Sequence, residues 1–156
     1  MSDQLVESRK LFIPGLAGLY QSLSPYAYVI VRFAIGAIMM PHGYGKLFGA
    51  FAPIVATHVL APMGLPAPLA IAYALGVLEF FGGACLALGF LTRPIAALFV
   101  IEFAVITFGV SFSHGFGFSA PGGGYEYPLL VLVVMVAIAI RGSDRCAIDR
   151  LIGKEF

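Results

Sequence analysis

Residues 32–48 read RFAIGAIMMPHGYGKLF, a hydrophobic segment that carries an arginine, a histidine and a lysine. Charged groups inside a membrane helix are costly, so they are normally paired or take part in function. Three glutamates, each inside or at the edge of another hydrophobic run, are the candidate partners: Glu79, Glu102 and Glu126. The rest of the sequence indicates what kind of protein holds these groups and how they could meet.

The composition is that of a membrane protein. Of the 156 residues, 60% are hydrophobic and 11% are charged, and the mean hydropathy is +0.98. Soluble domains usually contain about 25% charged residues, so this chain has too few to cover a water-facing surface. One integral membrane domain is the simplest interpretation. The net charge of +1 gives no reason to expect nucleic-acid binding.

Four hydrophobic runs predict four transmembrane helices. A proline-containing loop at 50–66 follows the first run, and its apolar residues recur with roughly helical spacing, which predicts a short interfacial helix. We therefore predict an all-α integral membrane protein, a four-transmembrane-helix bundle with a short interfacial segment after the first helix. The predicted spans are 25–48, 68–90, 94–112 and 126–141.

The distribution of basic residues predicts the orientation in the membrane. Four spans would place both termini and the turn at Arg93 on one side, which then carries seven Lys and Arg residues, whereas the other side has only Lys46. Because loops rich in Lys and Arg stay inside, both termini should be cytoplasmic. In this scheme 1–24 is a cytoplasmic N-terminal segment, 25–141 is the transmembrane domain and 142–156 is a cytoplasmic tail.

The face of the second span that carries Glu79 is made of small residues. Glu79 lies three residues after Gly76 and four before Gly83, so the three share one side of the helix. Faces of this kind let helices approach closely in lipid, which predicts that Glu79 points into the bundle. Glu102 in the third span has bulky helical neighbours instead, and the sequence does not place that face inside.

The outer ends of the first and fourth spans carry a predicted polar cluster. His42 and Lys46 are four residues apart and therefore lie on similar sides of the helix. Glu126 opens the fourth span at a similar depth, estimated from a rise of about 1.5 Å per residue. We therefore predict a Lys46–Glu126 or a His42–Glu126 contact, and we expect this cluster to receive the head group of a ligand.

Arg32 lies in the inner half of the first span, from which it can reach Glu79 or Glu102. Two interpretations of these charges stay open: static pairs that fix the helix register, or a polar cavity that holds a small head group or passes protons. No catalytic residue is assigned, and no metal is assigned because no two histidines have the spacing of a metal site. The ligand-binding or polar-cluster candidates are Arg32, His42, Lys46, Glu79 and Glu126, with Glu102 as a secondary candidate.

Several spaced motifs carry a resemblance to a known family. The first span contains R-x-x-x-G followed by H-G-x-x-K, the second contains E-x-x-G-G, and an L-T-R turn precedes the third. A glutamate opens the last span, and the tail reads S-D-R-C-A-I-D-R. The residues concerned are Arg32, Gly36, His42, Gly43, Lys46, Glu79, Gly82, Gly83, Leu91, Thr92, Arg93, Glu126 and 143–150. Together they resemble the DoxX family of small four-helix bacterial membrane proteins, although Glu102 matches no position of that pattern.

The resemblance implies a protein of the bacterial cytoplasmic membrane that is associated with redox or oxidative-stress complexes. The predicted function is an accessory, non-catalytic subunit of a membrane oxidoreductase system rather than an enzyme by itself. No cofactor is assigned, but a quinone is compatible because it needs an apolar slot with a few polar groups. The expected partners are the lipid bilayer and membrane or cytoplasmic redox proteins, and a homo-oligomer is left open. The alternatives are a small proton-coupled transporter or permease that uses Glu79 and Arg32, and a ligand-free membrane scaffold.

Overall fold

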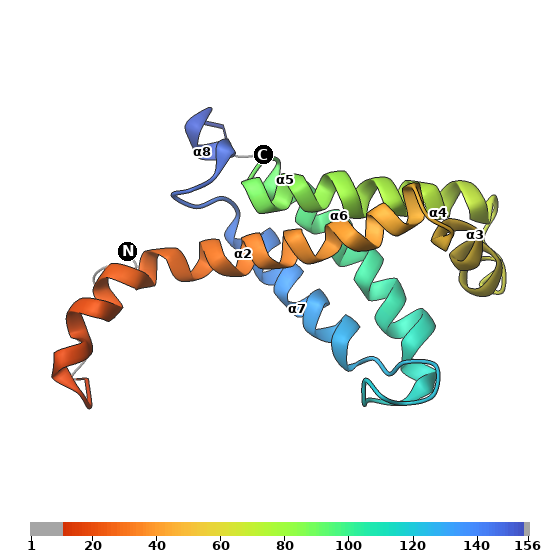
Figure 1. Ribbon diagram of the computed structural model, residues 1–156, viewed down its shortest axis with the longest axis horizontal. Coiled ribbons are helices and arrows are strands. Elements are labelled where there is room, and N and C mark those ends of the chain that lie inside the picture. The colour runs from red at the N-terminus through yellow and green to blue at the C-terminus, as the bar shows by residue number, and fades with distance from the viewer. Residues whose placement is uncertain (1–10, 155–156) are drawn as a thin grey trace.

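The computed structural model describes residues 11–154, and within that range the chain forms helices and loops without a strand (Figure 1). The first half contains a 3₁₀ turn η1 (Pro14–Leu16), α2 (Ala17–Leu47), α3 (Phe51–Val55) and a π-helical turn η2 (Ala56–Leu60). A second continuous rod consists of α4 (Pro68–Val77), the π-helical turn η3 (Leu78–Gly82) and α5 (Gly83–Leu88). The remaining elements are α6 (Thr92–Ala104), the π-helical turn η4 (Val105–Ser111), the 3₁₀ turn η5 (Phe112–His114), α7 (Glu126–Arg141) and α8 (Ile148–Leu151).

Three helical rods within the described residues 11–154 are long and apolar enough to cross a membrane. They run over Pro14–Leu47, Pro68–Leu88 and Thr92–His114, with 34, 21 and 23 residues, and a membrane helix needs about 20. The predicted fourth span forms α7 at the expected bounds, but its 16 residues cover only about 24 Å at a rise of about 1.5 Å per residue. Residues 11–154 therefore form an all-helical fold with three membrane-length helices and a shorter fourth helix.

The first long helix begins earlier than the sequence predicts. It starts at Ala17 rather than at Pro25, and both Pro25 and Pro41 lie inside it. Proline at an internal position removes one backbone hydrogen bond but already has a helical φ angle, so a helix can continue through it. The predicted helix start at Pro25 was therefore wrong, because residues 17–24 already belong to the same helix.

Two pairs of helices make up the fold. Figure 1 shows α2 running beside the α4–η3–α5 rod, while α6 and α7 form a second antiparallel pair inclined to the first. Glycines set the first contact: a Cβ at Gly36 would lie 2.6 Å from the backbone oxygen of Gly83, and one at Gly43 would lie 2.6 Å from that of Gly76. These backbones therefore touch, as small residues in membrane helices allow.

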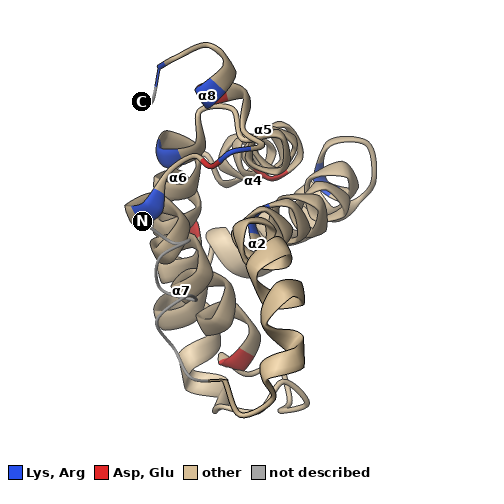
Figure 2. Cartoon of the chain, turned by 90° about the vertical axis from the view of Figure 1, so that its left-hand side faces the viewer, with Lys and Arg blue, Asp and Glu red and all other residues tan. Residues whose placement is uncertain are grey.

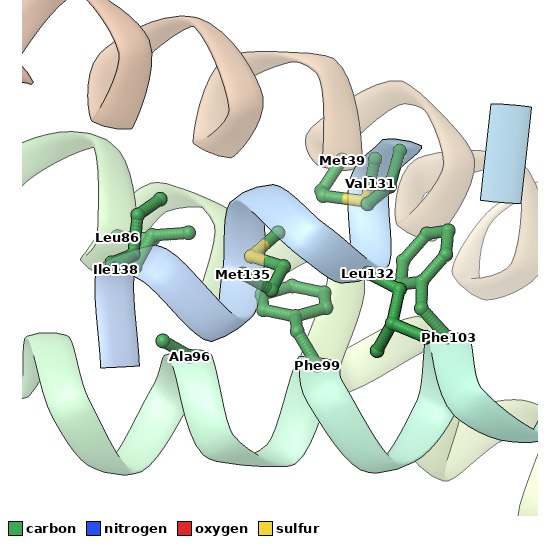
Figure 3. Packing of buried hydrophobic residues seen from close by; sticks show 9 residues of the cluster. All are labelled: Met39, Leu86, Ala96, Phe99, Phe103, Val131, Leu132, Met135 and Ile138. Atoms are coloured by element: carbon green, nitrogen blue, oxygen red, sulfur yellow. The ribbon is translucent and has the colours of Figure 1, made fainter. Parts of the chain in front are cut away.

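A buried apolar cluster joins the two pairs. Figure 3 shows side chains from α2, α5, α6 and α7 meeting in it, among them the fully buried Phe99 and Met135. Its members are Met39, Leu86, Ala96, Phe99, Phe103, Val131, Leu132, Met135 and Ile138. A smaller cluster of Ala52, Ala56, Leu60 and Ala72 packs α3 and η2 against α4. The predicted short helix after the first span is thus present and is held against the second span.

The C-terminal segment is tied to the end of the bundle. The buried carboxylate of Asp149 accepts hydrogen bonds from the backbone N–H groups of Leu91 and Thr92 at 2.8 and 2.9 Å, and from the Thr92 hydroxyl at 2.8 Å. Leu91, the N-cap residue before helix α6, has a φ of 51°, and its side chain makes no capping hydrogen bond. Asp149 therefore satisfies N–H groups that a helix N-terminus leaves free.

Candidate functional site

Lys46 and Glu79 form a buried ion pair between α2 and η3. The Lys46 ammonium donates to both carboxylate oxygens of Glu79, at 2.6 Å to Oε1 and 2.5 Å to Oε2. The side chains are 13% and 5% exposed. The predicted inward position of Glu79 is confirmed, and its partner is Lys46 of segment 32–48.

The small-residue face explains how this pair forms. Gly76 and Glu79 lie one helical turn apart, and a Cβ at Gly76 would lie 2.9 Å from the Lys46 Cβ. The missing side chain lets the stem of Lys46 pass over Gly76 to the carboxylate. Gly43 lies one turn before Lys46 and holds α2 against the same rod. Close helix packing and the ion pair are therefore two results of the same glycine pattern.

Glu102 lies beside this pair, on a face that the sequence left unassigned. Its side chain belongs to α6 and the residue is 6% exposed. Glu102, Glu79 and Lys46 all line one apolar cavity. Among the described residues, nothing partners the buried Oε2 atom of Glu102. The site thus contains one ammonium and two carboxyl groups, which we call the Lys46–Glu79–Glu102 cluster.

An apolar cavity of about 480 Å³ adjoins the cluster. All three cluster residues line it, and the rest of its wall is aliphatic apart from a methionine. Leu98, Ile101 and Val105 of the α6–η4 rod line the cavity and are 48%, 63% and 43% exposed, so the cavity lies next to the surface that faces lipid. The other lining residues are Val55, Val59, Leu60, Met63, Leu65, Ile71, Leu75, Leu78, Ile106 and Val110.

Each of the π-helical turns in residues 11–154 contributes to the wall of this cavity. Val59 comes from η2, Glu79 from η3 and Val110 from η4. A π turn widens the helix by one residue, and such turns are frequent at functional sites. Their convergence on one cavity distinguishes this region from the closely packed core of Figure 3.

The predicted cluster of Glu126 with Lys46 or His42 is wrong. Lys46 pairs with Glu79, whereas the exposed Glu126 accepts a hydrogen bond from the backbone N–H of Phe118 at 3.0 Å. His42 is also exposed. The Glu126 carboxylate therefore anchors the glycine-rich loop before α7. It does not form the predicted cluster with Lys46 or His42. The depth estimate placed Lys46 and Glu126 at one level but could not show which helix the lysine faces.

The predicted partner of Arg32 is also wrong. Its fully buried guanidinium contacts neither Glu79 nor Glu102 but the tail residue Asp144, through Nε at 3.2 Å and Nη2 at 3.4 Å. Nη1 donates to the backbone oxygens of Leu86 at 2.5 Å and Ala87 at 2.9 Å, at the end of α5. Arg32 therefore links α2 to the end of α5 and to the C-terminal tail.

Two important aspartates, Asp144 and Asp149, were not among the predicted site residues. Both lie in the S-D-R-C-A-I-D-R tail, which was noted only for its resemblance. Their spacing from the helices gave no indication of contact, because the chain turns back at Gly142, where φ is 78°. The sequence offered one signal. Asp144 and Asp149 are acidic residues close to the end of the fourth span, where one could pair with a buried arginine and the other could cap a helix.

Comparison with known proteins gives one match. The DoxX family model matches residues 27–112, which is more than half of the chain. The matched range includes all three cluster residues and Arg32. No curated protein and no solved structure was found to match. Within residues 11–154, no group of three or more His, Cys, Asp or Glu side chains is placed to hold a metal ion.

Proposed function

This chain belongs to the DoxX family, and we propose that it is an accessory membrane subunit of an oxidoreductase system that binds a quinone-type ligand. The observation that carries the proposal is the apolar cavity with a Lys46–Glu79–Glu102 cluster in its wall. A quinone needs an apolar slot for its ring and tail and a few polar groups for its oxygens. The cavity supplies both.

The size and position of the cavity support this ligand class. Its volume of about 480 Å³ falls within the range of small-molecule sites, roughly 300–1,000 Å³. A ring and the start of an isoprenoid tail can fit such a space. The exposed residues Leu98 and Ile101 at the wall let the rest of the tail continue into lipid.

The cavity favours an apolar ligand over a transported polar solute. Apart from the cluster its wall is apolar, and an unpaired polar solute in such surroundings would lose its hydration without replacement. Arg32, the second residue of the proposed transport route, lies in contact with the tail instead. The subunit role, as opposed to an independent enzyme, is supported by the resemblance to a family associated with membrane redox complexes.

A single introduced tryptophan tests ligand binding, because the natural chain contains none. In the variant Leu98→Trp the indole stands at the wall of the cavity, where a bound quinone quenches its fluorescence. We expect short-chain quinone to quench this protein in detergent micelles with a saturable dependence on concentration. A saturable curve reports a site, whereas partition into the micelle gives a linear one.

The matched control is Ile140→Trp. Ile140 is 74% exposed on α7 and does not line the cavity. Its tryptophan meets the same micelle but not the proposed site, so its quenching should stay linear. Identical linear curves for both variants would mean that the cavity does not bind quinone.

We also propose that α7 crosses the membrane as a fourth span, with both termini in the cytoplasm of a bacterial cell. Figure 2 shows several Lys and Arg residues gathered around the end where α8 lies. Arg150 belongs to α8, and Arg93 donates to the backbone oxygen of Arg141 at the end of α7. Basic residues are retained on the cytoplasmic side. The short α7 can cross if the bilayer thins locally or flanking residues reach the interface.

Reporter fusions test this topology. A reporter fused to the C-terminus and one inserted in the glycine-rich loop at 115–124 should report opposite sides of the membrane, with the C-terminus inside. At Gly123 nothing lies within 4 Å of an added Cβ, so an inserted side chain meets no neighbour there. The same side for both reporters would contradict the fourth span.

A further inference from the structure

The first long helix extends beyond the end of the helix it packs against. Gly36 of α2 contacts Gly83 of the second rod, and the two helices run antiparallel. The rod ends at Leu88, five residues after Gly83, which is the level of Val31 on α2. Every buried residue of α2 lies at Arg32 or later. The earlier turns of the helix therefore bury no residue against the rest of the described chain.

Polar contacts mark the level at which the membrane span of α2 ends. Tyr28 donates its hydroxyl to the backbone oxygen of Gly142 at 2.6 Å, and the Arg141 guanidinium lies 4.5 Å from the centre of the Tyr28 ring. One turn further along α2, Arg32 pairs with Asp144. Tyrosines are enriched at the membrane interface, and basic residues lie just outside the spans. The hydrocarbon span of α2 therefore ends near Tyr28, and the helix continues past it.

Residues 14–24, which we call the N-terminal arm, turn away from the axis of the span. Figure 1 shows the first turns of the helix, in red, at an angle to the rest of α2. Pro25 lies inside the helix and removes the hydrogen bond to the carbonyl of Gln21, a common cause of a kink. The 34 residues of Pro14–Leu47 would measure about 51 Å if straight, whereas the hydrocarbon core is about 30 Å thick. The bend takes the excess length out of the direction of the span.

The N-terminal arm has one apolar face. Leu16, Leu19 and Leu23 recur at spacings of three and four residues and share one side of the helix, with Tyr20 beside them. Leu19, Tyr20 and Leu23 are 51%, 45% and 55% exposed. No residue in 14–24 is charged, which is unusual for a helix surrounded by water. The other side carries small or uncharged polar residues: Ala17, Gly18, Gln21 and Ser24.

We propose that the N-terminal arm lies on the membrane surface, in the leaflet at the Arg32 end of the bundle, with its leucines among the outer acyl-chain carbons. Phospholipid then covers the apolar face, as it does for amphipathic helices that lie in the interface. The apolar face is continuous with the span, because Ile30 follows Leu23 by seven residues and is 64% exposed. In the sequence Arg9 and Lys10 precede the arm, and basic residues are attracted to anionic head groups.

Quenching by brominated lipids tests the position of the arm, because the chain contains no tryptophan of its own. The variants Leu19→Trp, Leu23→Trp and Gln21→Trp are reconstituted in vesicles whose phospholipids carry bromine either near the head group or near the chain end. We expect the tryptophans at 19 and 23 to lie at the same depth, about 5–10 Å into the boundary between head groups and acyl chains. The tryptophan at 21 should lie further out by about 10 Å, one helix diameter, and be quenched least.

The comparison of positions 19 and 23 reports the direction of the arm. The two residues are about 6 Å apart along the helix axis, so a helix that continued along the span would place them at depths that differ by about 6 Å. Such a difference, or no quenching at either position, would overturn the proposal. The control for insertion is Ile38→Trp, at a position of the span that is 46% exposed. Bromine near the chain end should quench it most.

A second copy of the chain is the alternative occupant of the apolar face. Dilution of the protein in lipid separates such copies, so quenching at positions 19 and 23 would then rise as the lipid-to-protein ratio rises, and the proposal would fail. An arm that lies in lipid gives the same quenching at every ratio. The cavity and its ligand play no part in this measurement, so its outcome is independent of the proposed quinone site.

Discussion

Asp144→Ala is expected to lower the free energy of unfolding by about 3–5 kcal/mol, because it leaves the buried Arg32 guanidinium without its counter-charge. The Arg32 side chain is fully buried and the Asp144 side chain is 6% exposed, so water cannot replace the lost carboxylate readily. The remaining partners of Arg32 are backbone oxygens of Leu86, Ala87 and Cys146, which carry only partial charge. The measurement is unfolding in micelles by titration with a denaturing detergent.

The control for this prediction lies in the same tail. Lys154→Ala also removes one charge, but at an exposed position, and surface charges contribute about 0–1 kcal/mol. The single variant Arg32→Leu and the double variant Arg32→Leu with Asp144→Ala complete a mutant cycle. The double variant should be destabilised by less than the sum of the single changes, because the second change removes the uncompensated charge left by the first. Additive losses would mean that the two side chains do not interact.

The parts of the fold that depend on local pattern could be predicted from the sequence. The second and third rods lie within two residues of the predicted spans, and α7 has the predicted bounds. Glu79 is buried as its glycine neighbours indicated, because backbone contact across small residues is a property of the helix face itself. These features need no knowledge of which helices are neighbours.

The pairing of the charges could not be predicted, because it depends on which helices are neighbours and where loops return. Depth along a helix axis cannot show that Lys46 faces the second rod rather than α7. It also cannot show that the tail folds back at Gly142 to bring Asp144 to Arg32, 112 residues away. The partners predicted for Arg32 came only from the hydrophobic spans, so the aspartates of the C-terminal tail were not among them.

The buried position of Glu102 could not be predicted for a different reason. Its bulky helical neighbours, among them Leu98, Val105 and Ile106, resemble a face that lies against lipid. They line a cavity beside that exposed surface, and Leu98 and Val105 are themselves 48% and 43% exposed. Lipid and an apolar cavity select the same side chains, so composition alone does not distinguish them. Only the buried carboxyl group on that face pointed to an interior.

Gly43→Leu is expected to destabilise the protein by about 3 kcal/mol or more, because a side chain at this position has no space between α2 and the second rod. A Cβ alone would lie 2.6 Å from the backbone oxygen of Gly76, and the backbone of Phe80 is also in contact. These atoms belong to a continuous helical rod and cannot move aside as a flexible side chain would. The two helices must therefore separate.

The smaller change Gly43→Ala distinguishes packing from helix propensity. Alanine favours a helix over glycine by about 1 kcal/mol, so a loss of stability can arise only from the contact with the second rod. Gly18→Ala in the same helix is the control, since nothing lies within 4 Å of a Cβ there. We expect Gly18→Ala to be neutral or slightly stabilising and Gly43→Ala to cost about 1–3 kcal/mol. Equal stability of the two variants would contradict the described packing.

Separation of the helices at Gly43 should also affect the candidate site. Lys46 follows Gly43 by one helical turn, and its ammonium reaches Glu79 only because α2 lies against the rod at Gly76. When Gly43→Ala is added to Leu98→Trp, the saturable quenching by quinone should weaken, whereas Gly18→Ala should leave it unchanged. The glycine contact would then be required for the ion pair and, through it, for the shape of the cavity beside Glu102.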